Sequence, residues 1–470
     1  MTLIHVFVFI LLALIAGSQV SPNRRLGFLF LGSVLALYWM QPATPLRNFD
    51  FWLPTATIAI TMLVWFRLHT NSDGMDREDR TALALVVLIT LAIAATRYLP
   101  SAFRLTSSLP PQVHTVILTL ILIIGLIGIT RFVGRGGDKL LIVLILILFI
   151  VMKTEPLALY FNRILRTLSR QNPMLANRLD LPWLGFSYLA FRLLHTLRDR
   201  AGNRLPAMTL REHVAYVLFF PTLSAGPIDR AERFVKDLRE PPVLDAERFF
   251  AGGERIAIGL LKKFVLADSL AIIALNEINA GQVTSSLWLW LLLYAFAFQI
   301  YLDFSGYTDV AIGIGILAGI NLPENFDRPY LQKSISDFWN RWHMTLAQWF
   351  RFYFFNPLTR VLRGAQREIP IWSLILVGQV GTMALIGLWH GISLNYLVWG
   401  VWHGIGLFIH NRWVAWLRSH PYVLGTVREH KALRVASTFL TFQFVVLGWV
   451  WFALPNVEIS WRVFRSLFGL

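Results

Sequence analysis

The 470-residue sequence contains no cysteine, and charged residues make up only 15% of it. The absence of cysteine excludes disulfides, thiol nucleophiles, Fe–S clusters and zinc sites with thiolate ligands. A soluble domain typically has about 25% charged residues, whereas this chain combines its low charge with 56% hydrophobic residues. No soluble domain, low-complexity linker or repeat of about 20–50 residues interrupts the apolar pattern. The composition therefore predicts an all-α, polytopic membrane protein.

Acidic residues are scarce beside basic ones, with 27 Asp and Glu against 43 Lys and Arg, so the net charge is +16. The basic residues do not cluster on a soluble domain, so we expect no nucleic-acid partner. They are expected in loops that face anionic lipid and the cytoplasm. Attraction of an anionic substrate or donor, such as coenzyme A or a phosphorylated carrier, is a second use for them.

The N-terminal part, residues 1–152, is predicted to be a transmembrane bundle. Most of its apolar runs approach the length of about 20 residues that crosses about 30 Å of hydrocarbon. The first run follows Met-Thr without a basic segment, so we expect a retained span and no cleaved signal peptide. The runs are 3–17, 26–40, 51–66, 81–99, 113–130 and 140–152.

Loop charges predict the orientation of this bundle. Eight basic residues follow the first, third and fifth runs, and three lie in the alternate loops. The positive-inside rule then places the N-terminus outside. Strict alternation would also leave the five basic residues of 153–178 outside. We therefore expect the short run 140–152 to be re-entrant, the alternative being a helix count that is wrong by one.

The pattern of apolar and polar segments changes after residue 180. Apolar runs there alternate with polar, aromatic-rich segments broken by prolines such as Pro221, Pro323 and Pro357. Polar backbone at membrane depth survives only where protein or a water-filled cavity surrounds it. Residues 153–410 are therefore predicted to form a cavity-containing core, followed by a C-terminal loop and transmembrane helix over 411–470.

Two acidic residues, Asp303 and Asp309, lie in or beside an apolar run. A carboxylate in a membrane is costly, so each is a candidate functional residue. The structural alternative is that each acid caps a helix or pairs with an arginine such as Arg328 or Arg341. The segment is expected to line the cavity in either case.

A second candidate segment, Asp337–Arg351, mixes tryptophans with polar residues in a pattern typical of a membrane interface. A single histidine such as His343 is more often structural. Here Asn340 and Arg341 lie beside it and could bind a polar substrate by hydrogen bonding or charge pairing.

His390 follows the apolar run Met383–Trp389 and is expected deep in the membrane. A neutral imidazole there can accept the proton of a hydroxyl that attacks an acyl carbon. A buried histidine is more often a packed core residue, and both possibilities stay open on these residues alone. His403 lies 13 residues further along without a nearby carboxylate, so we expect no metal site.

Six segments, in order, resemble the membrane-bound O-acyltransferase superfamily in its bacterial polysaccharide branch. The resemblance covers about residues 180–410. The segments are Gly185-Phe-Ser-Tyr188, Phe219-Phe-Pro221 with Ala225-Gly-Pro-Ile228, Tyr301-Leu-Asp-Phe-Ser-Gly-Tyr307, Pro323-Glu-Asn-Phe326, Phe338-Trp-Asn-Arg-Trp-His343 and Leu388-Trp-His-Gly391.

The resemblance implies a helical disc with a central tunnel and about 11–13 spanning or re-entrant helices. It assigns His390 as the catalytic base and places His343 on the same tunnel as a second catalytic residue. His343, with Asn340, would orient the acceptor or stabilise the oxyanion. Acyl transfer from a thioester to a hydroxyl is the implied activity. The predicted substrate-binding residues are Asn340, Arg341, Asp303, Tyr307 and Trp389.

The same resemblance implies a multi-pass protein of the bacterial cytoplasmic membrane without a permanently bound cofactor. The donor would be acyl-CoA, in particular acetyl-CoA, or an acyl-carrier-protein thioester. The acceptor would be a cell-envelope glycopolymer or an extracytoplasmic acyltransferase that relays the group.

Two branches of the family fit different motifs. Asn340 and Met344 resemble the branch that transfers D-alanine towards teichoic acid, whereas Tyr301–Asp309 resembles the alginate O-acetylation branch. Phe352 stands where an Asp is expected, and Thr359-Arg360 replace a Gly-Gly pair. A transporter or channel is a more remote alternative, because broken helices and intramembrane acids also occur there.

Overall fold

The computed structural model describes residues 2–69, 75–130, 136–364, 370–422 and 430–470. This part of the chain is built from helices and contains no strand, only an isolated antiparallel bridge between Phe326 and Trp342. It forms two compact units. Unit 1 comprises residues 1–256 and 310–323, and unit 2 comprises 257–309 and 324–470.

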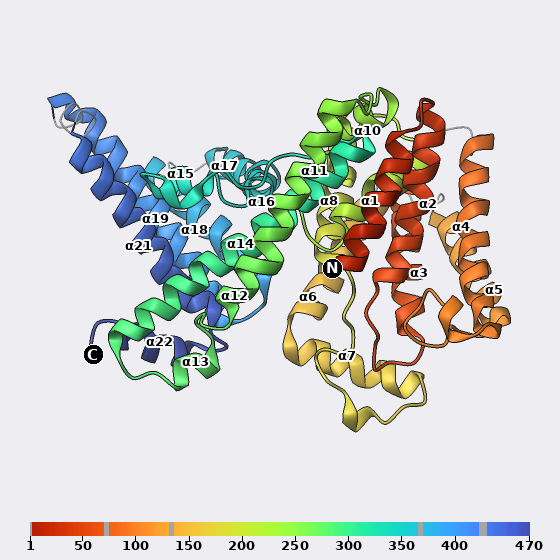
Figure 1. Ribbon diagram of the computed structural model, residues 1–470, viewed down its shortest axis with the longest axis horizontal. Helices are drawn as coiled ribbons and strands as arrows, with labels where there is room; N and C mark the ends of the chain where they lie inside the picture. Colours follow the sequence, from red (N-terminus) through yellow and green to blue (C-terminus); the bar gives the residue numbers. More distant parts are fainter. Residues whose placement is uncertain (1, 70–74, 131–135, 365–369, 423–429) are drawn as a thin grey trace. The chain divides into compact units, whose positions relative to one another are not determined.

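Unit 1 contains the uniform N-terminal helices (Figure 1). Its helices are α1 (Leu3–Gly17), α2 (Pro22–Met40), α3 (Phe49–Leu68), α4 (Arg77–Ala95), α5 (Val113–Ile129), α6 (Gly136–Lys153), α7 (Glu155–Leu168), α8 (Phe186–Ala201), α9 (Leu210–Val217), α10 (Ala231–Arg239) and most of α11 (Ala246–Leu260). Local sequence sets several starts. Asp76 caps α4, and Thr209 and Glu212 form a capping box at α9.

Unit 2 mixes long helices with short ones and with two π-helical turns, Leu261–Ala267 and Arg351–Phe355. Its helices are α12 (Asp268–Ala271), α13 (Glu277–Gly281), most of α14 (Ser286–Ala318), α15 (Ile335–Trp339), α16 (Met344–Phe350), α17 (Asn356–Arg363), α18 (Ile371–His390), α19 (Leu394–Ser419), α21 (Lys431–Ala453) and α22 (Val457–Ser466). This mixture of long and short helices follows from the prolines that interrupt the sequence after residue 180.

Five helices of the described chain are long and apolar enough to cross a membrane, and the bent pair of α6 and α7 would make a sixth. The five are α3, the helical stretch Arg77–Tyr98, α14, α18 and α21. Two shorter apolar helices, α1 and α5, add to them. The predicted class, an all-α polytopic membrane protein, is confirmed.

Helix α6 begins the segment that joins the two ends of the unit 1 helices. At its start, Asp138 pairs with Arg67 at the end of α3, with 2.9 Å between carboxylate and guanidinium. Beyond its end, the Gln171 amide donates to the Pro45 carbonyl (2.8 Å) in the loop before α3. The segment from the start of α6 to Gln171 therefore connects one end of α3 to the other. Helix α7 turns away from α6 by 97°, which fits either a broken span or a re-entrant segment, so the expected re-entrance of run 140–152 stays a prediction.

Loops at this second end of unit 1 brace one another. The Arg47 N–H donates to the Gln171 side chain (2.9 Å), and the Asn48 amide donates to the Leu109 carbonyl (2.6 Å). Buried Asp50 accepts from the backbone and hydroxyl of Ser108 at 2.6 and 2.7 Å. Three chain segments, 41–50, 97–112 and 169–184, thus meet at the same end of the bundle.

Candidate active site

His343 lies at the start of α16 in unit 2, in a left-handed backbone conformation with φ 43° and ψ 53°. This conformation is unusual for a residue with a side chain. The His343 ring does not cap the helix that it precedes. Its side chain is instead buried, edge-on to Phe304 with ring centroids 4.7 Å apart.

Asn325 fixes the protonation of the His343 ring. The Asn325 Oδ1 atom receives the backbone N–H of Thr345 at 3.2 Å and the Thr345 hydroxyl at 2.9 Å. An atom that receives a backbone N–H must be the amide oxygen, so the Asn325 orientation follows from this bond. His343 Nδ1 lies 3.2 Å from the same oxygen and must therefore donate to it. The neutral ring then carries its lone pair on Nε2.

The Nε2 atom of His343 is buried, and none of the described residues hydrogen-bonds to it. Burial lowers the pKa of the His343 imidazole well below its usual value, and the nearby His390 ring lowers it further. His343 is thus neutral and presents a lone pair without a partner in the described chain, which suits a hydrogen-bond acceptor for a hydroxyl.

His390 is the last residue of α18 and is partly buried. Four aromatic rings surround it, so its place is set by packing. The ring centroids of Trp389, Phe452, Trp399 and Tyr396 lie 4.6, 4.9, 5.6 and 6.0 Å from that of His390.

Close packing between α18 and α19 fixes the end of α18. A Cβ added to Gly387 would lie 2.1 Å from the Tyr396 carbonyl oxygen, and one on Gly400 would lie 2.3 Å from that of Met383. Glycine lets helix backbones approach closely in membranes. Gly387 of the Gly387-Leu-Trp-His-Gly391 motif therefore allows α18 and α19 to pack closely, and this packing fixes the position of His390.

Trp389 connects the two histidines. Its ring is buried, edge-on to His343 at 6.1 Å and to His390 at 4.6 Å between centroids. The structure thus brings together His343, His390 and Trp389 among the residues selected from the sequence. Tyr307 is buried on α14, and Phe304 of the same helix makes a ring contact with His343.

Asn340 is exposed and accepts a hydrogen bond from Arg351 at 2.9 Å. Both residues line a pocket of about 200 Å³ together with Trp339 and Gln379. Trp339 Nε1 and Gln379 Oε1 are buried and have no hydrogen-bond partner among the described residues. The pocket therefore offers one unused donor and one unused acceptor. The Trp339 ring also contacts Trp399, which in turn contacts His390.

The two acids of α14 pair with adjacent lysines, not with the arginines suggested by the sequence. Asp309 Oδ2 lies 2.7 Å from Lys262 Nζ, and Asp303 Oδ1 lies 2.5 Å from Lys263 Nζ. Gly306 lies between the acids, and a Cβ there would be only 2.8 Å from the Gly259 carbonyl oxygen. The close approach of backbone allows both ion pairs to form.

Arg341 also has a structural partner. Its Nε lies 3.4 Å from Asp327 Oδ2, and another of its guanidinium nitrogens hydrogen-bonds to Gln332. The structure does not place Arg341 or Asp303 in contact with either histidine. Their predicted part in substrate binding, like that of Asn340 and Tyr307, stays a prediction.

The sequence interpretation missed residues that support the site. Asn325 was visible only as part of the Pro323-Glu-Asn-Phe326 segment, with no role attached. Phe452 gave no signal because it is one apolar residue in a long apolar helix. Lys262 and Lys263 did give a signal in the sequence, since two lysines within an apolar run imply acidic partners. Among the described residues, no group of three or more His, Asp or Glu side chains could hold a metal ion.

These features define a polytopic membrane protein with one buried and one partly buried histidine, both in contact with Trp389. The profile of the MBOAT, membrane-bound O-acyltransferase family, matches residues 138–446. The chain belongs to this family.

Three relatives illustrate the range of the family around this chain. It is 33% identical over 312 residues to the probable alginate O-acetylase AlgI of Pseudomonas aeruginosa, covering 66% of this chain and 55% of the relative. It is 32% identical over 306 residues to the teichoic acid D-alanyltransferase of Bacillus subtilis, covering 63% and 75%. It is 33% identical over 265 residues to the peptidoglycan O-acetyltransferase of Helicobacter pylori, covering 55% and 47%. The alignment thus spans about half the length of the alginate and peptidoglycan relatives.

Proposed function

We propose that this protein is a membrane-embedded O-acyltransferase of the bacterial cytoplasmic membrane. It would move an acyl group, acetyl in the first instance, from a cytoplasmic thioester to a hydroxyl of a cell-envelope polysaccharide or of an extracytoplasmic relay enzyme. The observation that carries the proposal is the pairing of His343 and His390 through Trp389 in a chain of this family.

His390 is proposed as the general base. It takes the proton of the acceptor hydroxyl as the oxygen attacks the thioester carbon, and the thiolate of the donor leaves when the tetrahedral intermediate collapses. His390 then returns its proton to the thiolate. No cysteine is present, so no thioester forms on this chain.

His343 is proposed to orient the acceptor. The sequence left two roles open, orientation of the acceptor or stabilisation of an oxyanion. The Asn325 contact puts the ring proton on Nδ1, so Nε2 has a lone pair that attracts a hydroxyl proton and repels an oxyanion. The proton of the attacking hydroxyl goes to His390, so the role that we adopt for His343 is orientation of the acceptor through a different hydroxyl.

The pocket beside Asn340 is proposed to receive the arm of the donor. Coenzyme A and acyl carrier proteins both present their thioester on a pantetheine arm that contains two amides. The unpaired Trp339 donor and Gln379 acceptor suit such an amide. A separate groove of about 670 Å³ in unit 2 is lined by Lys333, Lys431 and Arg434, whose charge would attract an anionic donor.

The test is mass spectrometry of the cell-envelope glycopolymers from cells with the gene, cells without it and cells with His390→Ala at equal membrane abundance. The proposal expects one ester to be lost in the last two strains. The mass of that ester distinguishes acetyl from D-alanyl transfer, the alternative raised by the teichoic acid relative. Identical ester content in all three strains would reject the function.

A further inference from the structure

Helix α7 has its polar residues inside and its apolar residues outside. Its buried positions are Ala158, Asn162 and Arg166, which recur every four residues and so share one face. The opposite face is an exposed apolar stripe, with Leu168 75% and Tyr160 66% exposed. The complete stripe is Leu157, Tyr160, Phe161, Ile164 and Leu168.

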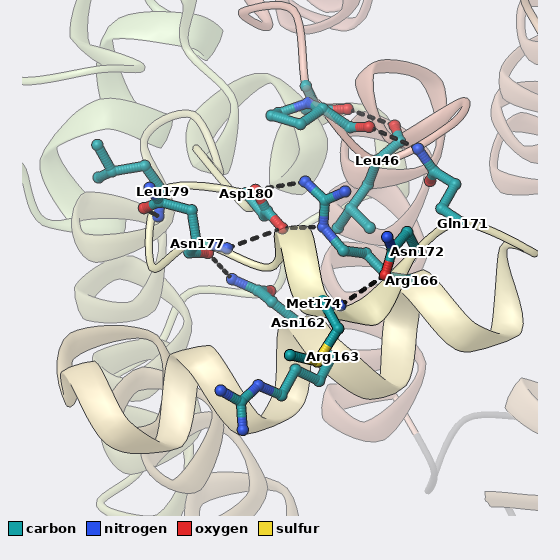
Figure 2. A network of polar contacts seen from close by, with 12 residues as sticks. Leu46, Asn162, Arg163, Arg166, Gln171, Asn172, Met174, Asn177, Leu179 and Asp180 are labelled. Atoms are coloured by element: carbon teal, nitrogen blue, oxygen red, sulfur yellow. Dashed lines mark hydrogen bonds and ion pairs between the residues drawn. The ribbon is translucent and has the colours of Figure 1, made fainter.

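The buried polar face holds the returning chain against the helix. Arg166 makes two bonds to Asp180, Nε to Oδ2 at 2.5 Å and Nη2 to Oδ1 at 3.0 Å. The Asn162 amide donates to the Asn177 carbonyl at 2.7 Å (Figure 2). The apolar stripe therefore faces away from unit 1 in a fixed orientation and does not result from a loosely attached helix.

The direction of α7 suits a helix that lies along a membrane surface. Helix α6 exposes apolar residues such as Leu144 and Ile147 along its length. Helix α7 follows it after a bend of 97° (Figure 1). If α6 crosses the bilayer, then α7 runs nearly parallel to the membrane plane, at the end of unit 1 where the loops 41–50 and 97–112 meet.

Basic residues flank the stripe. Arg163 is exposed and, at 100° per residue, lies about a quarter turn from the buried face, between it and the stripe. Arg170 is exposed just beyond the end of the helix, in a left-handed backbone conformation with φ 54°. Figure 2 shows Arg163 directed away from the Arg166–Asp180 pair. An apolar stripe with an adjoining basic edge is the pattern of helices that lie at the boundary between headgroups and acyl chains.

We propose that α7 is an in-plane membrane-interface helix, with its apolar stripe among the acyl chains and with Arg163 and Arg170 at the phosphates of anionic phospholipids. The preceding helix α6 also exposes apolar residues along its length, which favours lipid over a protein partner as the occupant. The proposal also explains the basic residues of 153–178. Arg166 is buried in an ion pair within the protein, so it is not a loop charge that reports cytoplasmic topology.

A cysteine-free chain makes this proposal directly testable. Single cysteines at Leu157, Tyr160, Ile164 and Leu168, and at Thr167 on the edge of the stripe nearest Arg163, would carry a nitroxide in protein reconstituted into phosphatidylglycerol–phosphatidylcholine vesicles. Collision with oxygen, which partitions into lipid, and with a water-soluble nickel chelate would be measured. We expect oxygen contact to dominate at the four stripe positions and nickel contact to dominate at Thr167.

Two other results would overturn the proposal. Nickel contact at the stripe equal to that at Thr167 would place α7 in water. Protection of the stripe from both reagents would mean that protein covers it, either a partner or a second copy.

The headgroup contact needs its own comparison. Arg163→Gln with Arg170→Gln should at least halve the phosphatidylglycerol retained by the purified protein, whereas Arg47→Gln at the same end of unit 1 should leave it unchanged. Equal retention by both variants would remove the anionic-lipid part of the proposal.

Discussion

The Asn325 side-chain oxygen lies 3.2 Å from His343 Nδ1 and holds the histidine in the tautomer that leaves Nε2 unprotonated. The same oxygen receives both the backbone N–H and the hydroxyl of Thr345, so Asn325 also ties the first turn of α16 to the preceding loop. The chemistry of His343 thus depends on a residue 18 positions earlier in the chain.

Asn325→Ala removes the acceptor that holds the ring proton on His343 Nδ1, so acyl transfer should fall about 10-fold or more. A tenfold fall in rate corresponds to a barrier that is higher by about 1.4 kcal/mol. Asn325→Asp keeps an acceptor oxygen for His343 Nδ1 and should retain more activity than Asn325→Ala. The measurement is kcat and KM for the acceptor, together with melting temperature. A rate loss that follows melting temperature alone in both variants would reduce Asn325 to a packing residue.

Gly400→Ala should destabilise the protein by about 1–3 kcal/mol and lower transfer, because the new Cβ would overlap the Met383 carbonyl and displace the end of α18 that carries His390. Gly381→Ala is the matched control on α18, since nothing lies within 4 Å of its added Cβ. Thermal unfolding in detergent and transfer assays would compare the two. Equal behaviour of both variants would contradict the proposed role of the α18–α19 contact.

Removal of Lys262 should destabilise unit 2 more than removal of Lys263. The Asp309 side chain is only 8% exposed, so Lys262→Ala leaves a buried carboxylate without its lysine at a cost of about 3–5 kcal/mol. The Asp303 side chain is 47% exposed, so water can solvate it in Lys263→Ala, and the loss should be about 1 kcal/mol or less. Unfolding midpoints would decide the order. The reverse order would contradict the burial of Asp309 as the cause.

Acid should destabilise unit 1. Burial lowers the pKa of His195 and of His213 to about 3, whereas an unfolded histidine titrates near 6.5. Their contribution to stability is therefore complete above about pH 6.5 and falls by about 1.4 kcal/mol per pH unit for each histidine as the pH drops towards 3. Burial raises the pKa of Asp229 to about 6, which acts in the opposite direction and offsets part of this loss.

The melting temperature in detergent should accordingly fall between pH 7 and pH 5. His213→Gln removes one titrating group and should show a shallower fall than the wild type. A wild-type melting temperature that is constant over this range would contradict the burial of neutral histidines in unit 1.

The sequence predicted the parts of this molecule that depend on composition and local pattern. Apolar runs placed the long helices, and the resemblance of the Trp389-His390-Gly391 segment directed attention to His390. The sequence alone could not predict that Asp303 pairs with Lys263 and that Asp309 pairs with Lys262, because both pairs depend on the close approach of two helices.

The orientation of α7 could not be predicted from the sequence either, because it also depends on contacts that exist only in the folded protein. Run 140–152 is short for a span, and a one-dimensional charge count could not show that Arg166 is buried against Asp180. Once such a pair forms within the protein, its arginine no longer reports which side of the membrane a loop occupies. The expectation of a re-entrant run rests in part on counting that residue with the others, and it stays a prediction.

The central claim, that His390 is the general base, is tested most directly by the rate of acyl transfer from a thioester donor to acceptor by reconstituted His390→Ala. His430→Ala, which removes an exposed histidine at the start of α21, is the control. The account predicts a fall of about 10²–10⁴-fold for His390→Ala and a wild-type rate for His430→Ala. Transfer by correctly folded His390→Ala within a few-fold of the wild-type rate would contradict it.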